Sequence, residues 1–171
     1  MKQFSIARAA IFACLCLGIS FSATETIAQI SKDHVVGTWS VVAVKDIRAD
    51  GTTTDTFGPN PMGTASFDSK GRFSIIILSS HLPKFASNNR TTGSAEDNKA
   101  VVQGSSIYYG SYSVSVADKS LIFQIEGSAF PNWTGTTQKR TIKTLSGDDL
   151  TLINAAASGG GVAEIQWRRM K

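Results

Sequence analysis

The sequence predicts an all-β protein, an eight-stranded antiparallel up-and-down β-barrel with one short helix in a long loop. Short runs rich in valine, isoleucine, tyrosine and phenylalanine alternate with turn signals along most of the chain. Within these runs apolar and polar residues alternate, which gives each strand one apolar face and one polar face. Closing such strands into a barrel removes exposed edges and places the apolar faces inside.

Turn signals divide the chain into the expected strands. The first run ends before Asp50-Gly51, a dipeptide typical of tight hairpins. Polar four-residue turns at 68–71, 117–120 and 146–149 join three further hairpins, and a triple glycine at 159–161 precedes the last run. The expected strands are residues 37–48, 62–67, 72–79, 107–116, 121–128, 136–145, 150–154 and 162–170.

A long insertion, residues 80–106, separates the third and fourth expected strands. Ser94 can cap a helix over residues 95–103, with Asp97 at its third position and Gly104 as its stop. Loops of this length are more often functional than not. We therefore expect the insertion to form a short lid or plug.

The first 28 residues have the layout of a secretory signal peptide. Lys2 and Arg8 precede an uncharged apolar run at 9–21, which is too short for a spanning helix of about 20 residues. Small residues at Thr26 and Ala28 favour cleavage after Ala28, with Ser22 as the second choice. The protein is expected to be secreted or periplasmic and to have no stable membrane anchor.

Both cysteines, Cys14 and Cys16, lie within the signal, so the mature chain can form no disulfide. A lipoprotein acylated at Cys14 is the alternative, although Phe12 fits that processing badly. Removing 28 of the 171 residues leaves 143, enough for one self-sufficient core. The expected domains are a signal peptide at 1–28 and a barrel at 29–171.

The charge of the mature chain is small and scattered. Without Lys2, Arg8 and Glu25, 15 basic and 12 acidic side chains remain, a net charge of +3. Strand alternation sends neighbouring cations to opposite faces, so no continuous basic surface is expected. This pattern does not favour a nucleic-acid partner.

Two short motifs resemble the signature of the lipocalin superfamily. Gly37-Thr38-Trp39 opens the first strand, and Trp167-Arg168-Arg169 stands near the chain end. In that superfamily a cation from the last strand lies over the indole of the Gly-x-Trp motif. The resemblance implies that Gly37, Trp39 and Arg169 close one end of the barrel, with Arg169 over Trp39 because Trp167 and Arg169 share a strand face.

Three further segments resemble the small bacterial and fungal lipocalin-like domain proteins, so the similarity covers nearly the whole mature chain. They are residues 57–63, 83–87 and 127–133. Lipocalin-like barrels mostly bind small apolar molecules in the lumen, and some relatives act as cyclases or isomerases. The resemblance implies the fold and a small apolar or amphiphilic partner, and it identifies no ligand.

The seventh strand places two polar side chains toward the lumen. Alternation puts Gln138, Arg140, Ile142 and Thr144 on one face, opposite Lys139 and Lys143, which must face water. A buried guanidinium is costly without a partner. Three interpretations remain open: Arg140 meets a protein carboxylate, it meets an anionic ligand group, or a bulge shifts the register.

Large inward side chains can line a cavity or fill it, and the sequence does not decide between these outcomes. The candidate ligand-binding residues are Arg140, Gln138, Tyr108, Tyr112, Phe73, Ile75, Phe123 and Trp133. No motif for nucleophilic catalysis, phosphate binding or metal binding is present, and no cofactor is expected. Of the two histidines, His34 is expected to be exposed at the barrel entry, before the first strand, and His81 to begin the insertion.

Three functions fit these observations. The first is binding of a small, largely apolar molecule, with or without an acidic group, in the lumen. The second is a cofactor-free cyclase or isomerase that uses the same lumen, for which the candidate acids and bases are Tyr108, Tyr112, Glu126 and His81. The third is a filled barrel that serves as a structural or partner-binding protein.

Overall fold

A computed structural model describes residues 30–171. The expected signal peptide and its cleavage site lie outside the described residues. No helix within 30–171 has the length and apolar character needed to cross a membrane.

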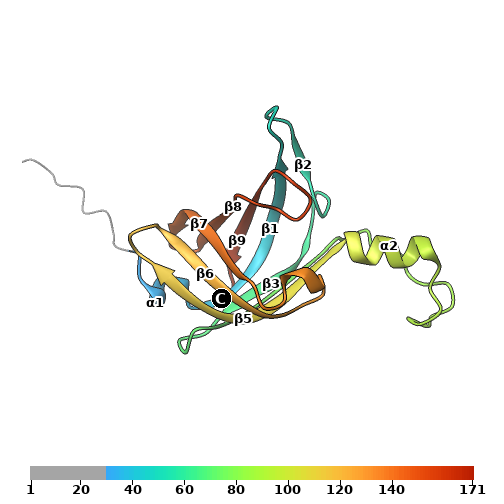
Figure 1. Ribbon diagram of the computed structural model, residues 1–171, viewed down its shortest axis with the longest axis horizontal. Helices are drawn as coiled ribbons and strands as arrows, with labels where there is room; N and C mark the ends of the chain where they lie inside the picture. Colours follow the sequence, from blue (N-terminus) through green and yellow to red (C-terminus); the bar gives the residue numbers. More distant parts are fainter. Residues whose placement is uncertain (1–29) are drawn as a thin grey trace, which may run out of the picture.

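One antiparallel sheet closes on itself through the pairing of β1 with β9, which confirms the predicted barrel (Figure 1). Consecutive strands are neighbours from β3 to β9, so the connections run up and down around the wall. The observed bounds lie within two residues of the expected ones. The barrel strands are β1 (Gly37–Ile47), β3 (Met62–Phe67), β4 (Arg72–Leu78), β5 (Ser105–Ser115), β6 (Ser120–Ser128), β7 (Thr137–Ser146), β8 (Asp149–Asn154) and β9 (Val162–Arg169).

A ninth strand, β2 (Thr53–Asp55), was not expected. It pairs with the last residues of β1, whereas β3 pairs only with the first four residues of that strand. β2 and β3 therefore lie along the same edge of β1 and pair with opposite ends of it. The segment between β2 and β3 brings Phe57, which is buried, to this side of the lumen.

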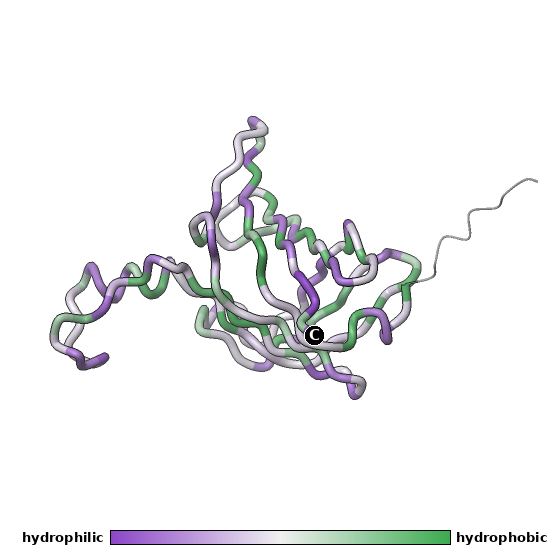
Figure 2. The backbone as a smooth tube through the Cα atoms, turned by 180° about the vertical axis from the view of Figure 1, so that it is seen from behind, coloured by the Kyte–Doolittle hydropathy of each residue, from purple (hydrophilic) through white to green (hydrophobic). Residues whose placement is uncertain are grey.

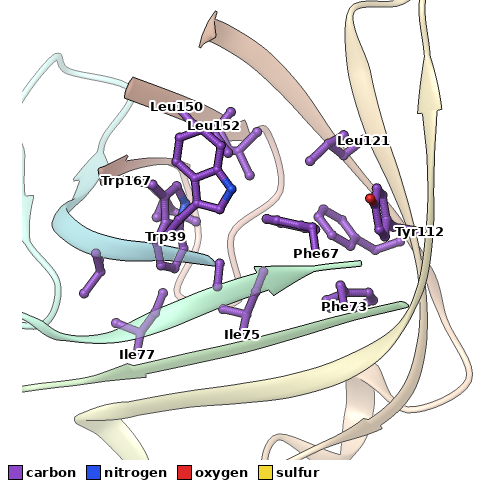
Figure 3. Close-up of a cluster of buried hydrophobic side chains, with 14 of the residues drawn as sticks. Trp39, Phe67, Phe73, Ile75, Ile77, Tyr112, Leu121, Leu150, Leu152 and Trp167 are labelled. Atoms are coloured by element: carbon purple, nitrogen blue, oxygen red, sulfur yellow. The ribbon is translucent and has the colours of Figure 1, made fainter. Parts of the chain in front are cut away.

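Inward side chains fill the half of the barrel where β1 begins (Figure 3). Trp39 and Trp167 pack beside Leu150 and Leu152, and the opposite wall contributes aromatic rings. Every apolar residue that alternation placed inside on β4 and β6 is buried. The buried set on these two strands is Phe73, Ile75, Ile77, Leu121, Phe123 and Ile125.

Two β-bulges change which residues face the lumen. On β7 the register shifts between Ile142 and Thr144, so Thr144 is exposed and Leu145 packs against the core. The expectation that Thr144 points inward is therefore wrong. On β1 the register shifts between Val41 and Ala43, which turns Val44 and Asp46 toward the lumen in place of their neighbours.

The predicted helix forms as α2 (Ala95–Gln103), with Ser94 as its cap. Asp97 N donates to Ser94 Oγ at 3.0 Å, and Ser94 N donates to Asp97 Oδ2 at 3.2 Å. The segment between β4 and β5, residues 79–104, forms an arm that carries α2. The arm extends away from the barrel and combines polar and apolar stretches (Figures 1 and 2). The expected plug is therefore absent from the lumen, although the last residues of α2 reach the rim of a cavity described below.

The other short helices lie at opposite ends of the barrel. α1 (Lys32–Val35) precedes β1 at the filled end, and the 3-10 helix η1 (Pro131–Trp133) connects β6 to β7 at the other end. His34 belongs to α1, directly before β1, and is exposed there as expected from the sequence. His34 in α1 and Val36 directly after it supply carbonyl groups that close this end.

A stacked pair, Trp39 and Arg169, closes the filled end. The guanidinium carbon of Arg169 lies 4.0 Å from the centroid of the Trp39 ring, and Trp39 is fully buried. Arg169 Nη1 donates to Val36 O and Nη2 to His34 O, both at 2.7 Å. Gly37 is required here because a Cβ at this position would lie 2.6 Å from Arg169 Nη1.

Arg169→Ala should lower the free energy of unfolding by roughly 2 kcal/mol or more, because it removes the cation–π contact and two hydrogen bonds. Arg168→Ala is the matched control, since Arg168 points outward into an exposed ion pair with Asp149 at 2.7 Å. That change should alter stability by less than about 1 kcal/mol. Urea denaturation of both variants measures the difference, and equal losses would contradict this account of the closed end.

Candidate functional site

The end of the barrel opposite Trp39 contains a cavity of about 480 Å³. This volume lies within the usual range for small-molecule sites, about 300–1,000 Å³. Its wall is formed by the ends of β1, β4, β5, β6, β8 and β9, by Arg140 of β7, by the end of α2, and by the segments before β3, after β6 and between β8 and β9. The lumen is therefore filled at one end and hollow at the other.

Apolar side chains make up much of the cavity wall. Val44 and Ile165 form its base on β1 and β9, and both are buried. Aromatic residues stand on the opposite side, where the ring of Trp133 lies 5.1 Å from that of Tyr108 and 5.8 Å from that of Phe130. The remaining apolar lining residues are Phe57, Ile77, Val101, Val102, Ile107, Ala129, Ala157 and Ala163.

Arg140 brings a positive charge into this apolar wall. Its side chain is only 3% exposed, which confirms that the β7 register holds at this position. Its Nη1 donates to Lys139 O at 3.0 Å and its Nη2 to Gln138 Oε1, while Nε has no hydrogen-bond partner within residues 30–171. Five ion pairs occur in this part of the chain, and none includes Arg140. The interpretation as an internal ion pair is therefore wrong for the described residues.

Burial shifts the pKa values of two neighbouring polar groups that line the cavity, Arg140 and Tyr108. It lowers the pKa of Arg140 from its ordinary value, an effect that the neighbouring Tyr108 opposes. Burial raises the pKa of Tyr108, which the charge of Arg140 partly offsets. An arginine remains charged at neutral pH even so. The site therefore presents a cation beside a neutral phenol.

Three of the eight candidate ligand-binding residues line the cavity, namely Arg140, Tyr108 and Trp133. Gln138 lies behind Arg140 and accepts its hydrogen bond. The rings of Phe73 and Phe123, with centroids 4.6 Å apart, pack beneath Tyr108, and Ile75 is buried in the same core. The aromatic candidates thus form one continuous series of packed rings. Only Tyr108 and Trp133, at the mouth end of this series, line the cavity.

Tyr112 lies at the far end of this series, against Phe67 at 5.1 Å. Its hydroxyl donates to Asp68 O at 2.9 Å, and burial raises its pKa to about 12. A groove of about 570 Å³ adjoins it between residues 30–32 and the β5–β6 hairpin. This groove lies outside the barrel and contains no buried charged side chain, so the mouth cavity is the better candidate site.

The residues considered for catalysis do not gather at one place. Glu126 is on the outer face, in an exposed ion pair with Arg72, whose guanidinium lowers the pKa of the Glu126 carboxyl. His81 is exposed at the start of the arm, where it lies near Gly58. Tyr112 is at the filled end, which leaves Tyr108 as the one member of this set that lines the cavity.

Sequence reasoning missed several polar lining residues, among them Asp46 and Asn154. Simple alternation from Trp39 would place Lys45 inside and Asp46 outside, and the β1 bulge reverses this. The signal was present, because an inward lysine is unfavourable in an apolar lumen. Asn154 ends β8, where its Oδ1 accepts from Ala156 N at 3.2 Å.

The closed end, the hollow end and the up-and-down wall together define a lipocalin-like barrel. A family model described as a lipocalin-like domain matches residues 36–170, and the chain belongs to this family. A comparison with curated proteins finds no match.

Two solved structures are similar in outline. One is a redesigned β-barrel, with a TM-score of 0.42 and 13% identity over 82% of this chain and 95% of that chain. The other is a de novo designed fluorescence-activating β-barrel, with a TM-score of 0.40 and 16% identity over 81% of this chain and 96% of that chain.

Arg140→Met should leave the free energy of unfolding within about 1 kcal/mol of wild type, or raise it, because the guanidinium is buried without a carboxylate partner. Ile142→Ala, at the next inward position of β7, should by contrast cost about 2–5 kcal/mol. Thermal and urea denaturation check both variants. A loss of several kcal/mol in Arg140→Met would show that the arginine has an internal structural partner.

Proposed function

We propose that the protein binds a small amphiphilic molecule in the mouth cavity, with the apolar part against the aromatic and aliphatic wall and an anionic or strongly polar group on Arg140. The observation that carries this proposal is the buried, unpaired Arg140 in an otherwise largely apolar wall. A ligand anion offsets the desolvation of the guanidinium without displacing a protein partner.

The arrangement around Arg140 supports this function. Gln138 and the Lys139 carbonyl hold the guanidinium in place, so little side-chain entropy is lost when a ligand binds. The apolar wall contributes affinity through burial of the ligand's hydrocarbon part. Neutral Tyr108 adds a hydroxyl group beside the charged site.

Wild-type protein should bind dodecanoic acid about tenfold more tightly than dodecanol, because only the acid gives Arg140 a charge-assisted partner. Arg140→Met should abolish this preference, and Lys139→Met should retain it because Lys139 is exposed on the outer face. Calorimetric titration measures the affinities. Trp133 lines the cavity, so its fluorescence should report binding and Trp133→Phe should remove most of the signal.

The same experiment can reject the function. If wild-type protein binds neither compound, the cavity is not a site for amphiphiles of this class. If both compounds bind equally to wild type and to Arg140→Met, Arg140 does not distinguish the carboxylate from the hydroxyl group.

We also propose that the protein is exported and that the mature chain begins at Gln29. Export would place the barrel where small molecules from the surroundings reach its mouth directly. Intact-mass measurement of the exported protein should give the mass of residues 29–171. A mass that retains Cys14, with or without acyl chains, would contradict this proposal.

A further inference from the structure

The mouth cavity contains two charged side chains of opposite sign. Among the described residues that line it, Arg140 on β7 and Asp46 on β1 are the only charged ones. Arg140 is buried and Asp46 is partly buried. Neither takes part in any ion pair found within residues 30–171.

The strand register places these two residues in one row around the wall. Asp46 is opposite Ala163 on β9, and Ala163 is opposite Asn154 on β8. Thr141 is opposite Ile153, so Arg140 and Asn154 occupy the next positions on β7 and β8. All four residues of the row line the cavity. The row therefore runs from a guanidinium through a carboxamide and a methyl group to a carboxylate.

Space remains between the two charges. Three strand spacings of about 4.8 Å, roughly 14 Å along the curved wall, separate the backbones at the two ends of the row, and the inward side chains of Arg140 and Asp46 shorten the gap between the charged groups. The short side chain of Ala163 does not fill this interval. The two charges thus flank an open part of the cavity and do not neutralise each other by direct contact.

One oxygen of the Asp46 carboxylate is enclosed by the protein without a hydrogen bond from residues 30–171. Gly161 approaches it so closely that a Cβ there would lie 3.3 Å from Asp46 Oδ1 and 2.8 Å from Ile47 O. Asp46 Oδ1 is enclosed and has no hydrogen-bond partner in the described part of the chain. Asp46 also lines the cavity, so a carboxylate with so little internal compensation presents its charge there to a donor from a ligand.

We propose that the ligand has a dipolar head group, in which an anionic part pairs with Arg140 and an ammonium or comparable cationic donor pairs with Asp46. This inference rests on the proposed function and specifies the ligand class for that site. A simple carboxylate satisfies Arg140 but brings a second negative charge into the cavity beside Asp46, which is unfavourable. A head group of both signs satisfies both residues and adds no net charge.

The two ends of the row then have separate effects on selectivity. Arg140 selects for the anion, and Asp46 selects for the cationic donor. Asn154, between them, offers a carboxamide to either part of the head group. The hydrocarbon part of the ligand packs against the aromatic residues at the mouth.

The test compares dodecanoic acid with α-aminododecanoic and β-aminododecanoic acid, which keep the chain length and add an ammonium at two spacings. We expect at least one amino acid to bind wild-type protein about tenfold more tightly than the plain acid. Asp46→Asn keeps the side-chain shape and should abolish this advantage without weakening binding of the plain acid. Asp55→Asn, an exposed change on β2, is the matched control and should retain the advantage.

Each outcome bears on one proposal. If the plain acid binds wild type and neither amino acid binds more tightly, the dipolar head group is wrong while the amphiphile site stands. The proposal of a dipolar head group would also be overturned if Asp46→Asn weakened the binding of dodecanoic acid and of the amino acids by the same factor. If none of the three compounds binds, the proposed function itself fails. Asp46→Ser serves as a second variant, and circular dichroism confirms that each variant is folded.

Discussion

The stacking of Arg169 on Trp39 is the interaction on which the rest of the barrel depends. It joins the first and last strands at the point where the sheet closes, and it ties both strands to α1 and its C-cap through the carbonyls of His34 and Val36. Because this end is sealed and filled, the large side chains of β4, β5 and β6 pack there without leaving open volume. The hollow part of the lumen is thereby confined to the opposite end.

The hollow end holds charges that a purely structural core would avoid. Replacing a buried unpaired arginine by an apolar residue is often neutral or stabilising. Its presence in a lumen whose other half is densely packed and apolar points to a role outside folding. Gln138, which faces the lumen but does not line the cavity, acts through Arg140 by fixing its guanidinium. The site is thus a polar row set into an apolar wall.

Much of this arrangement follows from local sequence pattern, and the exceptions have identifiable causes. Alternation predicted the buried faces of β4 and β6, and Ser94, Asp97 and Gly104 predicted the bounds of α2. The inward position of Asp46 depends on a bulge in β1, whose location is decided by pairing with β9 across the whole sequence. β2 is short, polar and exposed, so its strand state comes from pairing with β1 and leaves no hydrophobic signal.

The arm between β4 and β5 has a consequence for how the site responds to its surroundings. Val101, Val102 and Gln103 line the cavity, whereas the rest of the arm extends away from the barrel (Figure 1). A ligand bound as proposed would therefore contact the end of α2, and its binding would be linked to the position of the arm. If a surface binds the arm with a different affinity when the cavity is occupied, binding to that surface changes the ligand affinity by the same factor. The arm would then couple ligand binding in the cavity to contacts made outside the barrel.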